Sequence, residues 1–169
     1  MLSLRRNLLI ASVASGAMLC FSPAYAANRT IKVQLWDQGA MSMNMLGKGE
    51  MMDIEHANQV GMPKAPMGIR ISTSQIPAGY VTFKVVNTSK QMVHEMVLSA
   101  VSDTSKSPPY KKTENKIDED AAGHLGEVSE LEPGKKGVLK IHLKPGHYLL
   151  YCNIPGHYSL GMWTLLDVK

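Results

Sequence analysis

The chain has 169 residues, of which 44% are hydrophobic and 19% are charged, with a formal net charge of +4 at pH 7. This length is enough for one domain with its own core. The basic excess is small and scattered along the chain, which excludes a strongly cationic protein built to bind nucleic acid.

The N-terminal segment has the three-part pattern of a secretory signal peptide. Arg5-Arg6 precedes a mostly apolar run at residues 8–21, and Ala24-Tyr25-Ala26 supplies a small-x-small cleavage site. We therefore expect residues 1–26 to be removed on export to the periplasm. The alternative is an uncleaved membrane anchor, for which the apolar run is short of the ~20 residues that a span requires.

Cleavage would leave residues 27–169, which we expect to form a single domain. This mature chain keeps 16 basic residues against 14 acidic ones, a net charge of +2, and Cys152 is its only cysteine. In an oxidising compartment an unpaired thiol is a liability unless it is buried, paired between chains or bound to a metal. The compartment therefore favours a metal-ligand role for Cys152.

The mature chain begins with two contrasting segments. Residues 30–36 alternate apolar and polar side chains and predict a half-buried strand. Residues 39–67, which we interpret as a loop insertion, contain His56 and seven of the chain's twelve methionines: Met41, Met43, Met45, Met51, Met52, Met62 and Met67. Because thioethers select Cu(I), the segment is either a soft-ligand surface for that ion or a loop whose methionines pack over the domain or a partner.

Short strand patterns separated by Pro/Gly turns make up most of the remaining chain. They predict strands at residues 68–74, 80–87, 91–100, 125–131, 138–143, 147–152 and 162–168. Residues 101–122 are polar and predict a surface loop with one helical turn. Since no long helical period occurs, the pattern indicates an all-β antiparallel sandwich or barrel.

Three metal-ligand side chains follow one another at five-residue intervals near the C-terminal end. They are the thiol of Cys152, the imidazole of His157 and the thioether of Met162, and Pro155-Gly156 bends the chain between the first two. A trigonal copper site with a weak axial sulfur uses these ligand types together with a second imidazole. That second histidine must come from elsewhere in the chain.

Four of the remaining histidines are poor candidates for the missing ligand. His56 lies in the methionine-rich segment and His124 in a polar region, so neither is rigidly held. His142 falls on the outer face of its strand. His147 begins the strand that ends near Cys152, and five residues of extended chain separate their positions by roughly 16 Å.

His94 remains, in the most apolar strand, where a polar side chain without a partner would be costly. The predicted metal ligands are therefore His94, Cys152, His157 and Met162, with the two imidazoles and the thiolate in one plane and Met162 on the axis. Zinc fits poorly, because a thioether is not among its usual ligands. A cysteine nucleophile with His157 as its base is the other chemistry, but it leaves Met162 unexplained.

The Cys-x4-His-x4-Met loop with an upstream histidine in a strand resembles the cupredoxins, the small type 1 blue copper proteins, including their rusticyanin, auracyanin and azurin groups. Residues 79–87, 93–96 and 131–134 extend the resemblance, which covers most of the chain from residue 68 onward. It implies a Greek-key β-sandwich of about seven to eight strands, one type 1 copper ion and reversible Cu(II)/Cu(I) cycling. One departure is Glu95, which stands where azurin and plastocyanin have an asparagine that bridges the two ligand loops.

Together with the export signal and the small net charge, the resemblance leads us to expect a monomeric periplasmic one-electron carrier rather than an enzyme, with no nucleic-acid partner. It also implies that His157 exposes one edge, with Tyr158 and Leu160 forming a docking patch for redox partner proteins. The rival function is periplasmic copper handling, in which the methionine-rich segment binds Cu(I) and passes it on. A copper enzyme is less consistent, because nitrite reductases and multicopper oxidases place a histidine directly beside the type 1 cysteine.

Overall fold

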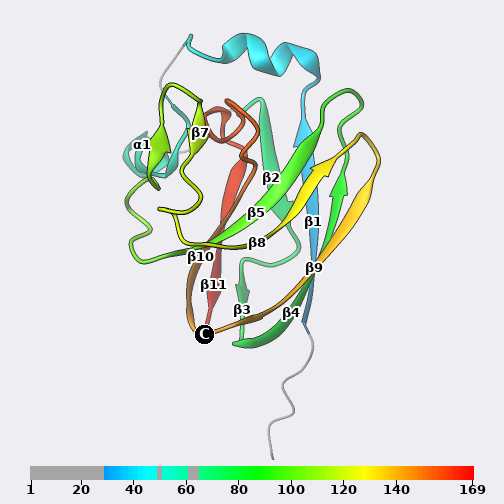
Figure 1. The fold of residues 1–169 in the computed structure, drawn as a ribbon, viewed down its shortest axis with the longest axis vertical. Helices are drawn as coiled ribbons and strands as arrows, with labels where there is room; N and C mark the ends of the chain where they lie inside the picture. The colour runs from blue at the N-terminus through cyan, green and yellow to red at the C-terminus, as the bar shows by residue number, and fades with distance from the viewer. Residues whose placement is uncertain (1–28, 49–50, 61–64) are drawn as a thin grey trace, which may run out of the picture.

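A computed structural model describes residues 29–48, 51–60 and 65–169 of the chain. The expected signal peptide at residues 1–26 lies outside the described residues, as does Met62. Within them, eleven strands form two main sheets and one small hairpin (Figure 1). None of the helices in these ranges is long and apolar enough to cross a membrane.

The first sheet has the strand order β2-β1-β4-β9. Its strands are β2 (Met67–Ile71), β1 (Arg29–Asp37), β4 (Gly79–Asn87) and β9 (Lys136–Leu143). The strand predicted at residues 30–36 is confirmed, but it pairs in parallel with β4. The expected antiparallel pairing holds for most strand pairs but not for this one, because the period-2 pattern is the same in parallel and antiparallel half-buried strands.

The second sheet has the order β3-β11-β10-β5-β8. Its strands are β3 (Gln75–Ile76), β11 (Trp163–Val168), β10 (Gly146–Tyr151), β5 (His94–Val101) and β8 (His124–Leu131). A further parallel pair joins β3 to β11, and the remaining pairs are antiparallel. Strands β5 and β10 therefore lie side by side and bring His94 and Cys152 to the same end of the sheet.

The core fills the space between the two sheets, and a smaller cluster covers the outer face of the second sheet. The main cluster includes Val33 and Phe83 from the first sheet and Leu98 and Leu150 from the second. The smaller cluster includes Val97. Strand β5 is thus buried on both faces, as its almost continuous apolar sequence predicts.

The polar excursion at residues 101–122 contains a hairpin that the sequence pattern did not predict. Strands β6 (Tyr110–Lys111) and β7 (Lys116–Ile117) pair antiparallel. The expected helical turn follows them, closed by the Ala122 N–H, which donates to the Asp118 carbonyl at 2.8 Å. Each hairpin strand has only two residues, too few for a period-2 pattern to identify.

The methionine-rich segment crosses one end of the sandwich. It contains the 3₁₀-helix η1 (Ala40–Met45) and the α-helix α1 (Ile54–Val60). Figure 1 shows η1 running across the end opposite the C terminus. It contacts a second short 3₁₀-helix, η2 (Tyr158–Leu160), which belongs to the loop carrying His157 and Met162. The segment thus lies directly over the predicted ligand loop.

Candidate metal centre

Three of the four predicted ligands meet at this end of the sandwich. His94 is the first residue of β5, Cys152 directly follows β10, and His157 lies after the Pro155-Gly156 bend. Their exposed fractions are 0%, 0% and 3%. The position of each imidazole and of the thiol is therefore fixed by a strand or a closed loop within the protein interior.

The ligand atoms of these side chains face one another. The His94 and His157 Nδ1 atoms are 3.2 Å apart, and the Cys152 Sγ atom is 3.3 Å from His157 Nδ1. One donor atom from each side chain lies within 4.8 Å of the other two, close enough to bind a single ion. The donor set of two imidazoles and one thiol matches the plane of a type 1 copper site.

The loop between Cys152 and Met162 is closed by its own backbone. Gly156 and Gly161 have φ values of 86° and 91°, a conformation that glycine adopts without steric cost. The His157 carbonyl accepts from the Met162 N–H at 3.1 Å, and the Met162 carbonyl accepts from the Cys152 N–H at 3.0 Å. These bonds hold Met162, which is fully buried, beside Cys152.

Burial sets the protonation state of these three side chains. Desolvation raises the pKa of Cys152 to about 12 and lowers the pKa of His157 to about 4. Desolvation also lowers the pKa of His94, although its hydrogen bond to Asp37 opposes this shift. The metal-free site at neutral pH therefore holds a thiol and two neutral imidazoles, and metal binding has to displace the thiol proton.

Asp37, at the end of β1, completes the site behind His94 and was not predicted as a site residue. Its Oδ2 atom lies 2.7 Å from His94 Nε2, and its side chain is 1% exposed. Burial raises the pKa of Asp37, but hydrogen bonds from Ser89, His94 and Gly39 outweigh it and leave the pKa below its usual value. The sequence pattern predicted only that Asp37 ends a strand. No motif indicated its contact with His94, which lies 57 residues further along the chain.

Glu95 connects the two segments that carry His94 and Cys152. Its Oε1 atom accepts from the Asn153 N–H at 3.0 Å, and its own N–H points to Cys152 Sγ at 3.5 Å. The Asn153 side chain in turn accepts from the Ile117 N–H at 2.7 Å and donates to Glu119 at 2.6 Å. The carboxylate therefore joins the start of β5 to the residue after Cys152.

Solved structures of similar shape establish the fold. Rusticyanin from Thiobacillus ferrooxidans aligns with a TM-score of 0.52 at 20% sequence identity, over 83% of this chain and 76% of that one. Reduced rusticyanin gives the same score and identity over 83% and 78%. This chain has the cupredoxin fold. Auracyanin from Roseiflexus castenholzii aligns at 17% identity and a TM-score of 0.49, over 85% of this chain and 98% of that one.

No protein-family model matches the sequence, and a comparison with curated proteins finds no match. At identities of 20% or less the likeness establishes the architecture alone. The geometry described above, which comes from this chain's own residues, is therefore the observation on which a function has to rest.

The ligand end of this cupredoxin fold is covered, contrary to the expected exposed edge of His157. Tyr158 and Leu160, which we expected to form a docking patch, are 1% and 3% exposed. Met43 and Leu46, from η1 and the residue after it, lie so close to Gly156 that a Cβ atom there would be 2.8 Å from Leu46 Cδ2. The expected patch is therefore wrong. Leu160 belongs to the core cluster against which Met43 and Leu46 pack, and the Tyr158 ring lies among the rings of Tyr110, Tyr151 and Trp163.

Hydrogen bonds also attach the segment to the ligand loop. The Met52 N–H donates to the Ser159 carbonyl at 2.8 Å. The indole N–H of Trp163 donates to the Met52 carbonyl at 2.6 Å. The two bonds tie Met52 to η2 and to the first residue of β11. We refer to residues 39–52, as far as they are described, as the cover.

The described methionines of residues 39–67 have different environments. Met67 is in the core, Met43 packs against its edge and Met51 packs against the smaller cluster. Among the described residues of this segment, Met41 and Met45 are the strongly exposed methionines, at 73% and 45%. Packing over the domain, one of the two roles considered for this segment, therefore accounts for several of them.

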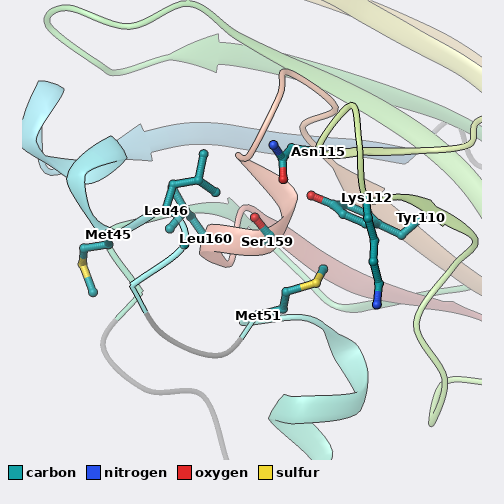
Figure 2. A pocket seen from close by; sticks show the side chains of 9 residues that line it. Met45, Leu46, Met51, Tyr110, Lys112, Asn115, Ser159 and Leu160 are labelled. Atoms are coloured by element: carbon teal, nitrogen blue, oxygen red, sulfur yellow. The ribbon is translucent and has the colours of Figure 1, made fainter.

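A surface pocket of about 310 Å³ lies between the cover and the β6–β7 hairpin. Its lining includes Met45, Met51, Lys112 and Leu160. Figure 2 shows the Met45 and Met51 side chains extending in different directions. The two thioethers therefore do not converge on one point in this pocket.

Three of the four histidines that we set aside have partners other than the ligand group, while the fourth, His56, lies in α1. His142 is exposed and packs against the Tyr80 ring. His147 pairs with Asp167 at the opposite end of β10, and His124 lies on the surface near Glu127. The choice of His94 by elimination agrees with the observed grouping.

Proposed function

We propose that this protein is a periplasmic type 1 copper protein that carries single electrons. The observation that carries the proposal is the convergence of His94 Nδ1, His157 Nδ1 and Cys152 Sγ in a buried site at one end of a cupredoxin fold. Met162 is proposed as the axial fourth ligand, since it is fully buried and bonded through its backbone to Cys152. The N-terminal pattern at residues 1–26 supports export.

The chemistry of the donor set fits copper better than the common alternatives. A bound copper ion would supply one-electron chemistry by cycling between Cu(II) and Cu(I). Two imidazoles, one thiolate and one thioether offer borderline and soft ligands together, which suits both oxidation states. Structural zinc sites use four cysteine or histidine ligands, and this site has only three among its described residues.

The protein contributes rigidity and exclusion of water. His94 is held by β5 and by Asp37, while the Cys152–Met162 loop is held by its own backbone bonds and by Glu95. A site held in this way needs little rearrangement when its charge changes. The apolar side chains around it, including Ile154 and Leu160, lower the local polarity and so favour the less charged oxidation state.

Redox partner proteins would dock transiently at the ligand end near His157. Because His157 is 3% exposed, the surface offered to a partner is the cover rather than the imidazole edge. Its exposed side chains include Met41 and Met45. Small, weak interfaces are typical of such redox encounters.

The visible absorption spectrum of the copper-loaded protein tests the site. A thiolate bound to Cu(II) gives strong visible absorption, as the cupredoxin resemblance implies. Substituting Cys152→Ser is expected to abolish that absorption, whereas Ser159→Ala, in the same loop, is expected to keep it. An intact colour in the Cys152→Ser variant would show that the thiol is not a ligand. Unchanged colour and copper affinity after His94→Ala would remove His94 from the ligand set.

Copper handling through the methionine-rich segment remains the rival function, and stoichiometry separates the two. An electron carrier binds one copper per chain in both oxidation states. A handling protein would bind additional Cu(I) in the segment containing Met41 and Met45 and deliver it to an acceptor. Titrating the Met41→Leu/Met45→Leu variant with Cu(I) is expected to give the same single equivalent as the unmodified protein.

A further inference from the structure

Asp37 ends strand β1 with its carboxylate buried directly behind the His94 ring. Its Oδ2 atom is 2.7 Å from His94 Nε2, and the two side chains are 1% and 0% exposed. Its Oδ1 atom accepts from the Gly39 N–H at 2.5 Å. Both carboxylate oxygens are therefore used, one toward the ligand and the other toward the first residues of the cover.

The hydrogen bond between Asp37 Oδ2 and His94 Nε2 determines which nitrogen of His94 is available to a metal. An ionised carboxylate only accepts hydrogen bonds, so the proton of a neutral His94 ring must be on Nε2. The lone pair is then on Nδ1, the atom that faces His157 Nδ1 at 3.2 Å and lies in the ligand group with Cys152. Metal-binding histidines commonly have such a partner on their other nitrogen, and it fixes both tautomer and ring orientation.

The carboxylate also places a negative charge one imidazole ring away from the site. A buried charge of this kind is weakly screened by solvent and salt. It attracts the more positive oxidation state of a bound ion more strongly than the less positive one. The apolar residues around the site have the opposite effect, so Asp37 counteracts them.

We propose that Asp37 is a positioning residue of the metal site, which fixes His94 for binding through Nδ1 and stabilises the oxidised state by its charge. The inference rests on the proposed function, because it concerns the same site. It also links the site to the cover: Asp37 holds Gly39, where a φ of 93° turns the chain from β1 into η1.

Two substitutions separate the charge from the hydrogen bond. Asp37→Asn keeps an oxygen that can accept from His94 Nε2 but removes the charge, whereas Asp37→Ala removes both. Asp167→Asn is the matched control, because the Asp167 carboxylate also contacts a histidine, His147 Nδ1 at 2.6 Å, but lies exposed at the opposite end of β10. Asp167→Asn changes the net charge of the protein by the same amount as Asp37→Asn.

Four measurements are made on each variant. Copper affinity is measured separately for Cu(II) and Cu(I), and the reduction potential is measured by redox titration. Nitrogen-15 NMR of the metal-free protein reports the tautomer of His94 without any copper present. Circular dichroism establishes that each variant is folded.

The expected results differ between the variants. Asp37→Ala is expected to weaken Cu(II) binding about 10–100-fold and to lose the uniform Nε2–H tautomer of His94. Asp37→Asn is expected to weaken Cu(II) binding about tenfold more than Cu(I) binding, which corresponds to a rise in potential of about 59 mV. Asp167→Asn is expected to change none of these quantities.

The inference is overturned if Asp37→Asn leaves the potential and the Cu(II)/Cu(I) affinity ratio unchanged. It is equally overturned if His94 keeps its Nε2–H tautomer and its Cu(II) affinity in Asp37→Ala. Failure of the proposed function looks different, because the unmodified protein would then bind no copper or show no thiolate absorption.

Discussion

The imidazole of His157 is buried, and desolvation lowers its pKa to about 4 from the ordinary value of 6.5. When the metal-free chain unfolds, this histidine regains its ordinary pKa and binds a proton that the folded state does not bind. The contribution of the neutral His157 imidazole to the unfolding free energy is therefore fully present above pH 6.5. It is lost as the pH falls toward 4. The shift corresponds to roughly 3 kcal/mol of unfolding free energy.

Denaturant unfolding of the metal-free protein between these pH values measures that contribution. The His157→Gln variant is expected to lose less stability on acidification than the unmodified protein. The His142→Gln variant, changed at an exposed position, is expected to follow the unmodified protein. Parallel pH curves for the unmodified protein and His157→Gln would contradict the assignment of a buried neutral imidazole.

Glu95 leads to a second prediction for a single residue. Its carboxylate accepts the N–H of Asn153, a residue that is 2% exposed. Glu95→Ala leaves that N–H without its acceptor and is expected to lower the unfolding free energy by about 1–3 kcal/mol. Glu95→Gln keeps an oxygen acceptor and is expected to cost less.

Urea denaturation of the metal-free variants checks the role of Glu95. Glu130→Ala provides the comparison, since Glu130 is an exposed glutamate on β8. If Glu95→Ala were no less stable than Glu130→Ala, the carboxylate would not be joining the two ligand segments.

At the scale of elements, the contact between the cover and the ligand loop depends on Gly156. A Cβ atom there would be 2.8 Å from Leu46 Cδ2, and the φ of 86° is itself unfavourable for other residues. Gly156→Ala is therefore expected to cost about 1–2 kcal/mol from the backbone, with an added steric cost from Leu46.

A double-mutant cycle separates these two costs. Leu46→Ala removes the opposing side chain, so Gly156→Ala is expected to be less destabilising in that background. Hydrogen exchange of residues 40–48 should also increase in Gly156→Ala, because the cover is displaced. Strictly additive stability changes would mean that Leu46 does not pack against the loop.

The sequence predicts most of the individual strands but fewer of their contacts. Alternation identifies β1, β4 and β9, because one face of each is buried and the other exposed. It does not predict the parallel pairing of β1 with β4, which depends on how distant segments cross the sandwich. The hairpin of β6 and β7 is too short to produce a pattern.

At the candidate metal site, too, the sequence predicts some residues but not the contacts that depend on distant segments. The grouping of His94, Cys152 and His157 could be predicted, because metal chemistry limits the residue types and the apolar strand limits the choice of histidine. Asp37 was not predictable, since an aspartate at a strand end is most simply a turn residue. The burial of His157 was also missed, because a sequence pattern does not show which distant segments pack around a loop.

For the whole molecule, the fold gathers the functional features at one end. Strands from the second sheet bring His94 and Cys152 together, β1 from the first sheet supplies Asp37, and the cover lies over the ligand loop. Under the proposed function, the exposed methionines of the cover belong to the surface that a redox partner would approach. The arrangement suits an ion that stays bound while its charge changes.

Spectroelectrochemical titration of the copper-loaded protein tests most directly whether the site holds one ion in both oxidation states. One copper per chain is expected, with visible thiolate absorption that disappears on addition of one electron and returns fully on reoxidation. The metal content should be the same before and after the cycle. Absence of the thiolate absorption, or loss of copper on reduction, would contradict a site built to hold the ion in both oxidation states.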